Sequence, residues 1–139
     1  MEIVIDTDTI VKDVQSAFNI VYPYLKIEFY KKHHTESDQF LKFEKLNPSQ
    51  KFNRFTKAGN KVHIDIDAKK TVTQLENDFL EFTGTWAQIF RRSGNMWIET
   101  SLTDDWTLER QNKAGELFSA VPQKKSQQEN LEDQRFDEE

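Results

Sequence analysis

The chain has 139 residues, the length of one domain, and a formal net charge of −5. It has no cysteine, which excludes disulfides, thiolate metal sites and cysteine nucleophiles. Its hydrophobic content of 36% and its mean hydropathy of −0.79 are low. No segment approaches the roughly 20 apolar residues that cross a bilayer, so we expect a cytoplasmic protein without membrane contact.

The first elements predicted along the chain are a strand, a helix and a second strand. Ile3 and Ile5 alternate with polar neighbours, which predicts a strand over 2–6. Apolar residues at spacings of three, four and three then predict a helix, which Pro23 ends. A second strand is predicted over 26–32. The apolar stripe of the helix consists of Val11, Val14, Phe18 and Val21.

The middle of the chain shows less regular patterns. Residues 39–45 fit either a loop or an edge strand. Pro48 indicates the first turn of a short helix, because proline at that position loses no hydrogen bond, and Gly59 suits its end. The residues predicted to anchor this helix are Phe52 and Phe55.

A second strand and helix follow, with clearer boundaries. Val62, Ile64 and Ile66 alternate with polar residues, as in a half-buried strand. The segment 71–74 reads Thr-Val-Thr-Gln, a capping box that predicts a helix start, and Gly84 suits a left-handed helix exit.

The last part of the chain predicts a hairpin and a final helix. Strands are expected over 86–92 and 96–100, joined by a turn around Gly94. Thr103, followed by two aspartates, places a cap and negative charge where we expect the final helix to begin.

Two parts of the chain resemble each other, which predicts an internal repeat of residues 2–32 and 61–100 within a single domain of 1–121. Two such β-α-β units favour an α+β fold: a two-layer sandwich with the helices on one face of the sheet. A ferredoxin-like arrangement is the first choice and a β-grasp-like arrangement the second. Residues 122–139 form a polar, acidic tail, predicted to be disordered. The matching blocks are Ile5–Asp8 with Ile64–Asp67, the helical stripe Val11, Val14, Phe18 and Val21 with the stripe Val72, Leu75, Phe79 and Phe82, and Phe29–Lys32 with Ile89–Arg92.

The hairpin and the residues after it suggest a surface for binding a protein partner or a second copy of the chain. Trp97 and Trp106 flank an acidic segment, and exposed tryptophan beside charge is typical of binding hot spots. Packing of both rings beneath the sheet is the alternative. The residues of the predicted surface are Arg91, Arg92, Trp97, Asp104, Asp105 and Trp106.

Binding of single-stranded nucleic acid is the alternative function. Aromatic and basic residues recur at matching places of the two units, and rings beside cations on a sheet bind such strands. The slightly acidic body of the domain argues against it, and strand-end charges in solvent explain the same residues. The residues concerned are Tyr30, Lys31, Lys32 and Phe90, with Arg91 and Arg92.

Catalysis and cofactor binding find little support in the residues. The chain shows neither a nucleophile elbow nor a phosphate-binding loop, so we predict no enzyme and no cofactor. The weak exception is a metal-dependent enzyme that uses His63, Asp65 and Asp67 at alternate positions of one strand. The alternative reading of these three residues is the solvent face of that strand.

The hairpin region resembles a family of small uncharacterised bacterial proteins. The similarity lies in Phe90–Thr100 and in Thr103–Asn112, and extends to Thr71–Phe82 and Tyr22–Phe29. It implies a cytoplasmic bacterial protein. The family has no known activity, cofactor or catalytic residue, so the resemblance assigns no function to any position.

Overall fold

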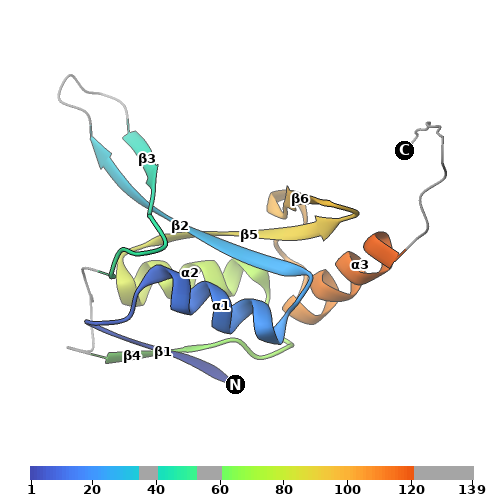
Figure 1. Cartoon of the computed structure of the whole chain (residues 1–139), viewed down its shortest axis with the longest axis horizontal. Helices are drawn as coiled ribbons and strands as arrows, with labels where there is room; N and C mark the ends of the chain where they lie inside the picture. Colours follow the sequence, from blue (N-terminus) through green and yellow to red (C-terminus); the bar gives the residue numbers. More distant parts are fainter. Residues whose placement is uncertain (35–40, 53–60, 121–139) are drawn as a thin grey trace.

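The computed structural model describes residues 1–34, 41–52 and 61–120, and Figure 1 shows how they are arranged. This part of the chain is mixed α+β, which confirms the predicted fold class. None of its helices has the length and hydropathy that a membrane span requires. The elements in chain order are β1 (Glu2–Asp6), α1 (Val11–Val21), β2 (Leu25–His34), β3 (Leu41–Lys45), β4 (Lys61–Asp65), α2 (Val72–Thr83), β5 (Trp86–Ser93), β6 (Met96–Glu99), the 3-10 helix η1 (Ser101–Thr103) and α3 (Leu108–Ala120).

The strands form two antiparallel sheets, with α1 and α2 between them (Figure 1). The larger sheet has the order β3-β2-β5-β6, and the smaller consists of β1 and β4. The predicted ferredoxin-like single sheet with helices on one face is not confirmed. The reason is that β1 and β4 pair with each other, and that α1 and α2 pack against this pair as well as against β2 and β5.

The core lies where the two helices meet the sheets. Phe18 of α1 and Phe79 of α2 are fully buried, as is Phe29 of β2. The Phe29 and Phe79 rings meet edge to face, with their centroids 4.9 Å apart. The inward side chains of β2 and β5, including Ile27 and Ile89, complete this core. Burial of alternate residues fixes which face of each strand points outward.

The start of α1 is covered by the segment that follows β3. The backbone N–H of Val11 donates to the Gln50 carbonyl at 2.8 Å, and the N–H of Lys12 donates to the Pro48 carbonyl at 2.8 Å. Residues 48 and 49 form a turn, and Lys51 forms a bridge to the chain before α1. The predicted helix at Pro48 is therefore wrong in its first residues. The carbonyls of Pro48 and Gln50 accept hydrogen bonds from the start of α1 instead of from a helix of their own. Phe55 and Gly59 lie outside the described residues.

The start of α2 is covered in a similar way by the segment that follows β6. The N–H groups of Val72 and Thr73 donate to the carbonyls of Trp106 and Asp104, at 3.1 and 2.9 Å. This use of residues 104–106 explains why the last helix begins only at Leu108, later than predicted.

The predicted ends of α2 are confirmed. Thr71 and Gln74 form the capping box, in which each side chain bonds the other residue's backbone N–H. Gly84 ends the helix with φ of 70°, a left-handed conformation that glycine adopts without strain. The hairpin of β5 and β6 also matches the predicted strands. Residues 39–45 were expected to form either a loop or an edge strand, and β3 shows that the edge strand is correct.

One end of β2 lies at an open edge of the larger sheet. β3 pairs with β2 only from Tyr30 onward, so it leaves the first residues of β2 uncovered on that side. Side-chain amides of α1 bond the carbonyls there. Gln15 Nε2 donates to the Ile27 carbonyl at 2.8 Å, and Asn19 Nδ2 donates to the Leu25 carbonyl at 2.9 Å.

Candidate functional site

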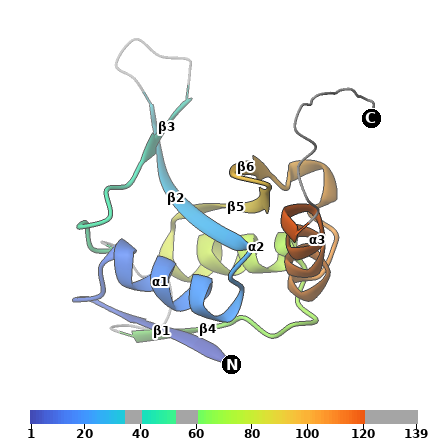
Figure 2. The same cartoon turned by 45° about the vertical axis from the view of Figure 1, so that its right-hand side comes forward.

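The candidate site is the outer face, the side of the four-stranded sheet that points away from α1 and α2 (Figure 2). Side chains alternate between the two faces of a strand. Ile27, Phe29 and Ile89 are buried and point to the helices, so the residues next to them in sequence belong to the outer face. Direct cross-strand pairs share this face. Its side chains are Lys26, Glu28, Tyr30 and Lys32 of β2, Phe43 and Lys45 of β3, Trp86, Gln88, Phe90 and Arg92 of β5, and Trp97 and Glu99 of β6.

Cations lie against aromatic rings at the β6 end of the outer face. Lys26 Nζ is 5.2 Å from the centroid of the Phe90 ring and 5.4 Å from that of Trp97. Arg92 Cζ is 5.3 Å from the Trp97 centroid. These distances are typical of cation–π contacts, which hold both the cation and the ring in place on the sheet.

The β3 end of the outer face repeats this arrangement with other residues. Lys32 Nζ lies 4.5 Å from the centroid of the Trp86 ring and 5.6 Å from that of Phe43. The Phe43 and Trp86 rings meet edge to face, with their centroids 5.7 Å apart. Phe43 is still 56% exposed, so its ring offers surface to a ligand.

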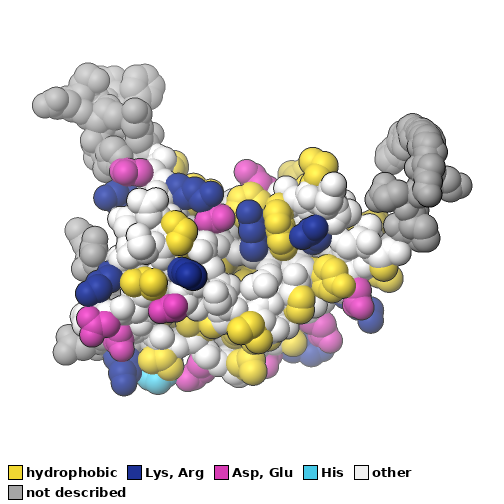
Figure 3. All heavy atoms as spheres, viewed as in Figure 1, with side chains coloured by type: hydrophobic (Ala, Val, Ile, Leu, Met, Phe, Trp, Pro, Cys, Tyr) yellow, Lys and Arg dark blue, Asp and Glu magenta, His cyan; other side chains and the backbone are white. Residues whose placement is uncertain are grey.

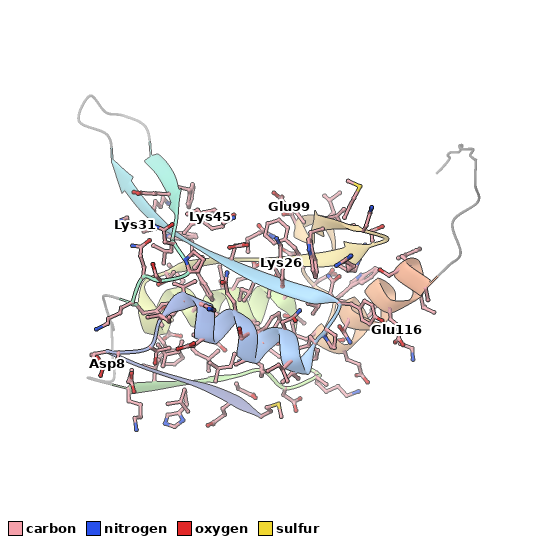
Figure 4. The ribbon with its side chains drawn as sticks, viewed as in Figure 1. Asp8, Lys26, Lys31, Lys45, Glu99 and Glu116 are labelled. Atoms are coloured by element: carbon pink, nitrogen blue, oxygen red, sulfur yellow. The ribbon has the colours of Figure 1, made fainter. Side chains whose placement is uncertain are left out.

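The outer face carries a positive local charge although the chain as a whole is acidic. Its strands contribute four cations and two anions, and 4 − 2 gives a net charge of +2. Glu28 Oε2 lies 3.6 Å from the Nζ atoms of both Lys26 and Lys45. Lys26, Lys45 and Glu99 lie on the side of β2 away from α1 (Figure 4). Lys, Arg and hydrophobic side chains adjoin on the side of the molecule above β2 (Figure 3).

A cavity of about 450 Å³ opens at the β3 end of the outer face. Glu76 of α2 reaches it and accepts a hydrogen bond from the backbone N–H of Ile89. Burial, opposed by that hydrogen bond and aided by the charge of Asp104, raises the pKa of Glu76 to about 7. The residues lining this cavity, which we call the Glu76 pocket, are Tyr30, Phe43, Glu76, Trp86, Ala87, Gln88 and Glu99.

The residues predicted to bind nucleic acid are divided between the two sides of the sheet. Tyr30, Lys32 and Phe90 lie on the outer face, together with Arg92. Lys31 points the other way, where its Nζ is 4.0 Å from Glu44 Oε1. Arg91, described next, also lies on the inner side.

The predicted binding surface of the hairpin is not contiguous. Arg91 Nη1 donates to Gln111 Oε1 of α3 at 2.8 Å, and its guanidinium lies 5.6 Å from the Trp106 ring centroid. Burial lowers the pKa of Arg91. Gln111 is fully buried and donates to the carbonyl and the hydroxyl of Thr103. Arg91 and Trp106 are therefore half-buried beside α3, while Arg92 and Trp97 lie on the outer face.

The acidic residues between them have different surroundings. Asp104 is half-buried, and its carbonyl accepts hydrogen bonds from both the N–H and the hydroxyl of Thr73. Asp105 is exposed. These contacts indicate that Asp104 takes part in the start of α2, whereas Asp105 is accessible to solvent.

The weak metal candidate lies on the other sheet. His63 Nδ1 is 3.0 Å from Glu2 Oε1 across the β1–β4 pair. Asp65 accepts from the N–H of Asp67, and Asp67 accepts from the N–H of Lys69. Among the described residues, no three His, Asp or Glu side chains gather as a metal site would require.

Sequence reasoning missed Glu76 of the pocket and seven residues of the outer face, namely Lys26, Glu28, Phe43, Lys45, Trp86, Gln88 and Glu99. Lys26 and Trp86 fall at outward positions of predicted strands, so strand alternation was the signal that could have found them. Glu76 comes from a helix, and nothing in the local sequence indicates that α2 brings it to the edge of β5.

The chain matches no protein-family model, no curated protein and no solved structure.

Proposed function

We propose that the protein binds single-stranded nucleic acid on the outer face of its four-stranded sheet. The observation that carries the proposal is the set of cation–π pairs across this face, in which Lys26, Lys32 and Arg92 lie against aromatic rings. Bases stack on aromatic side chains whatever their sequence, and the neighbouring cations meet the phosphates.

Stacking and local charge set the scale of the expected binding free energy. Stacking contributes about 1–3 kcal/mol per base by alanine substitution. Two or three bases stacked on rings such as Phe43, Phe90 and Trp97 would therefore contribute about 2–9 kcal/mol, and a micromolar affinity corresponds to about −8 kcal/mol. The local charge of +2 adds an attraction that increases as salt is lowered.

The net charge of the chain differs from the local charge of the outer face. Three cations and six anions in residues 122–139 contribute −3 of the total of −5. Charges farther from the face than about 10 Å are largely screened at about 0.1 M salt. The local charge of the outer face therefore affects the binding of phosphates more than the net charge of the whole chain does.

A direct test is fluorescence anisotropy of a labelled, mixed-sequence single strand of about 12 nucleotides, a length within known site sizes. We expect saturable binding at low salt, and a severalfold or larger loss in the Trp97→Ala variant. Ile20→Ala is the control, because Ile20 is 78% exposed on α1. Absence of binding at low salt, or equal losses in both variants, would contradict the proposal.

Association with a protein partner, or with a second copy of the chain, is the second candidate. It is favoured by exposed apolar side chains near the end of α3, where Leu117 is 59% and Phe118 57% exposed. Light scattering after gel filtration at several concentrations tests self-association. A monomer at all concentrations, unchanged by Leu117→Ser and Phe118→Ser, excludes the second copy as the partner.

We also propose that the chain contains two copies of one structural unit, residues 2–32 and 61–100. Two registers support this. β1 and β4 pair around Val4 and His63, and β2 and β5 pair around Glu28 and Gln88, so corresponding strands are partners. An experimental structure in which the two units do not superpose would refute the proposal.

A further inference from the structure

The Glu76 pocket combines an aromatic wall with hydrogen-bond acceptors. Tyr30, Phe43 and Trp86 provide the rings, from three adjacent strands of the sheet. Its volume of about 450 Å³ lies within the range of about 300–1,000 Å³ found for small-molecule sites. A flat aromatic group is therefore the kind of ligand that its walls favour.

The polar groups of the pocket include several hydrogen-bond acceptors. Glu76 and Glu99 contribute carboxyl groups from α2 and β6. Gln88 Nε2 donates one of its two N–H groups to the Ile89 carbonyl at 3.0 Å, and the side-chain oxygen of Gln88 is a further acceptor. Ser101 Oγ is 3.3 Å from Glu99 Oε1, a long contact that leaves the other carboxylate oxygen for a ligand.

We propose that the Glu76 pocket holds one base of the bound strand and selects bases that carry an exocyclic amino group over uracil and thymine. This inference rests on the proposed nucleic-acid function. A carboxylate accepts from the N4 amino group of cytosine, and the rings hold the base by stacking.

Uracil presents the opposite pattern at the same position. Its carbonyl oxygen replaces the amino group of cytosine at position 4, so two acceptors would face each other at Glu99, and also at Glu76 when the pH is well above 7 and its carboxyl is ionised. An acceptor buried without a donor loses its hydrogen bonds to water without replacement. The pocket therefore discriminates by penalising the wrong base as well as by binding the right one.

The test compares, at pH 8, labelled oligo-dC and oligo-dU of about 12 nucleotides, whose bases differ at position 4 and in the proton that uracil carries on N3. We expect oligo-dC to bind at least about fivefold more tightly, since one good base contact corresponds to about 1–3 kcal/mol. Glu99→Gln should reduce this preference, because an amide also donates to the uracil carbonyl. Glu76→Gln should do the same, and Glu99 is the safer variant because it is exposed.

Glu116→Gln is the matched control, an identical change on an exposed residue of α3 (Figure 4). It should leave the preference for oligo-dC unchanged. Equal binding of the two oligonucleotides by the wild type would overturn the pocket inference and leave the proposed function standing. A preference that survives in both pocket variants would overturn it too. If neither oligonucleotide binds at low salt, the proposed function itself fails.

Discussion

Removal of one cation from the outer face should change the salt dependence of binding by a calculable amount. For single strands, the slope of log K against log salt is about −0.7 for each phosphate neutralised. Lys26, Lys32, Lys45 and Arg92 together set a limit of about −2.8. If the two glutamates of the face offset two of these cations, the slope is about −1.4.

The perturbation is Lys32→Ala, because Lys32 bonds no glutamate in the described contacts and lies over Trp86 and Phe43. Between about 50 and 200 mM salt, the wild type should lose about sevenfold to fiftyfold in affinity. Over the same salt range, the affinity of Lys32→Ala should fall by a factor about 2.6 times smaller than that of the wild type, since its slope is less steep by about 0.7. Anisotropy titrations at four or five salt concentrations measure both slopes.

Lys61→Ala is the control for this experiment. Lys61 is exposed and carries the same charge, but it belongs to β4 of the other sheet. Its removal should leave the slope within error of the wild type, because screening weakens charges beyond about 10 Å at about 0.1 M salt. An equal change in slope for both lysines, or an unchanged slope for Lys32→Ala, would refute the assignment of binding to the outer face.

Three further predictions concern folding stability, measured by urea denaturation. Burial raises the pKa of Glu76 from 4.5 to about 7, so the folded state binds more protons than the unfolded state between these values. Wild-type stability should therefore fall as pH rises through this window relative to Glu76→Gln, by about 1–2 kcal/mol after solvent screening is allowed for. Gly115→Ala should destabilise by about 1–3 kcal/mol, because the added Cβ would lie 2.8 Å from Tyr24 Cβ and 3.1 Å from the Tyr24 carbonyl. Gln111→Leu should cost about 2–4 kcal/mol, since it leaves the half-buried Arg91 guanidinium without its acceptor.

Each of these predictions has its own contrary outcome. An equal difference between Glu76→Gln and the wild type at pH 4 and pH 8 would show that the carboxyl does not titrate as proposed. Gly115→Ala is judged against Glu116→Ala, an exposed neighbour on α3. A stabilising Gly115→Ala, the usual result for a glycine inside a helix, would contradict the close approach of α3 to Tyr24. A neutral Gln111→Leu would show that water replaces the amide as the acceptor for Arg91.

Local patterns in the sequence predicted the elements well, and distant contacts explain where they failed. The stripe of α1 and the capping box at Thr71 depend on neighbouring residues, and both helices form as expected. The segment at Pro48 looks like a helix start by its local chemistry, yet its carbonyls bond the N–H groups of α1. A contact across nearly 40 residues of chain has no signature in either segment alone.

The same distinction applies to the candidate site. Tyr30, Phe90 and Arg92 were found because aromatic residues followed by basic residues recur at matching places of the two predicted units. Their separation from Arg91 follows from side-chain alternation, which sends neighbours to opposite faces. Glu76 could not be found, since its role depends on how closely α2 approaches β5. The division into two sheets was equally inaccessible, because both topologies require the same strand and helix patterns.

The amide side chains at the open end of β2 have a consequence for the molecule in concentrated solution. An unpaired strand edge forms hydrogen bonds readily with a strand edge of another molecule, and continued addition of strands leads to fibres or precipitates. Gln15 and Asn19 occupy two carbonyls that such an intruding strand would need. Through these two side chains, α1 protects the open edge of β2 from pairing with another molecule, while the outer face of the sheet stays accessible.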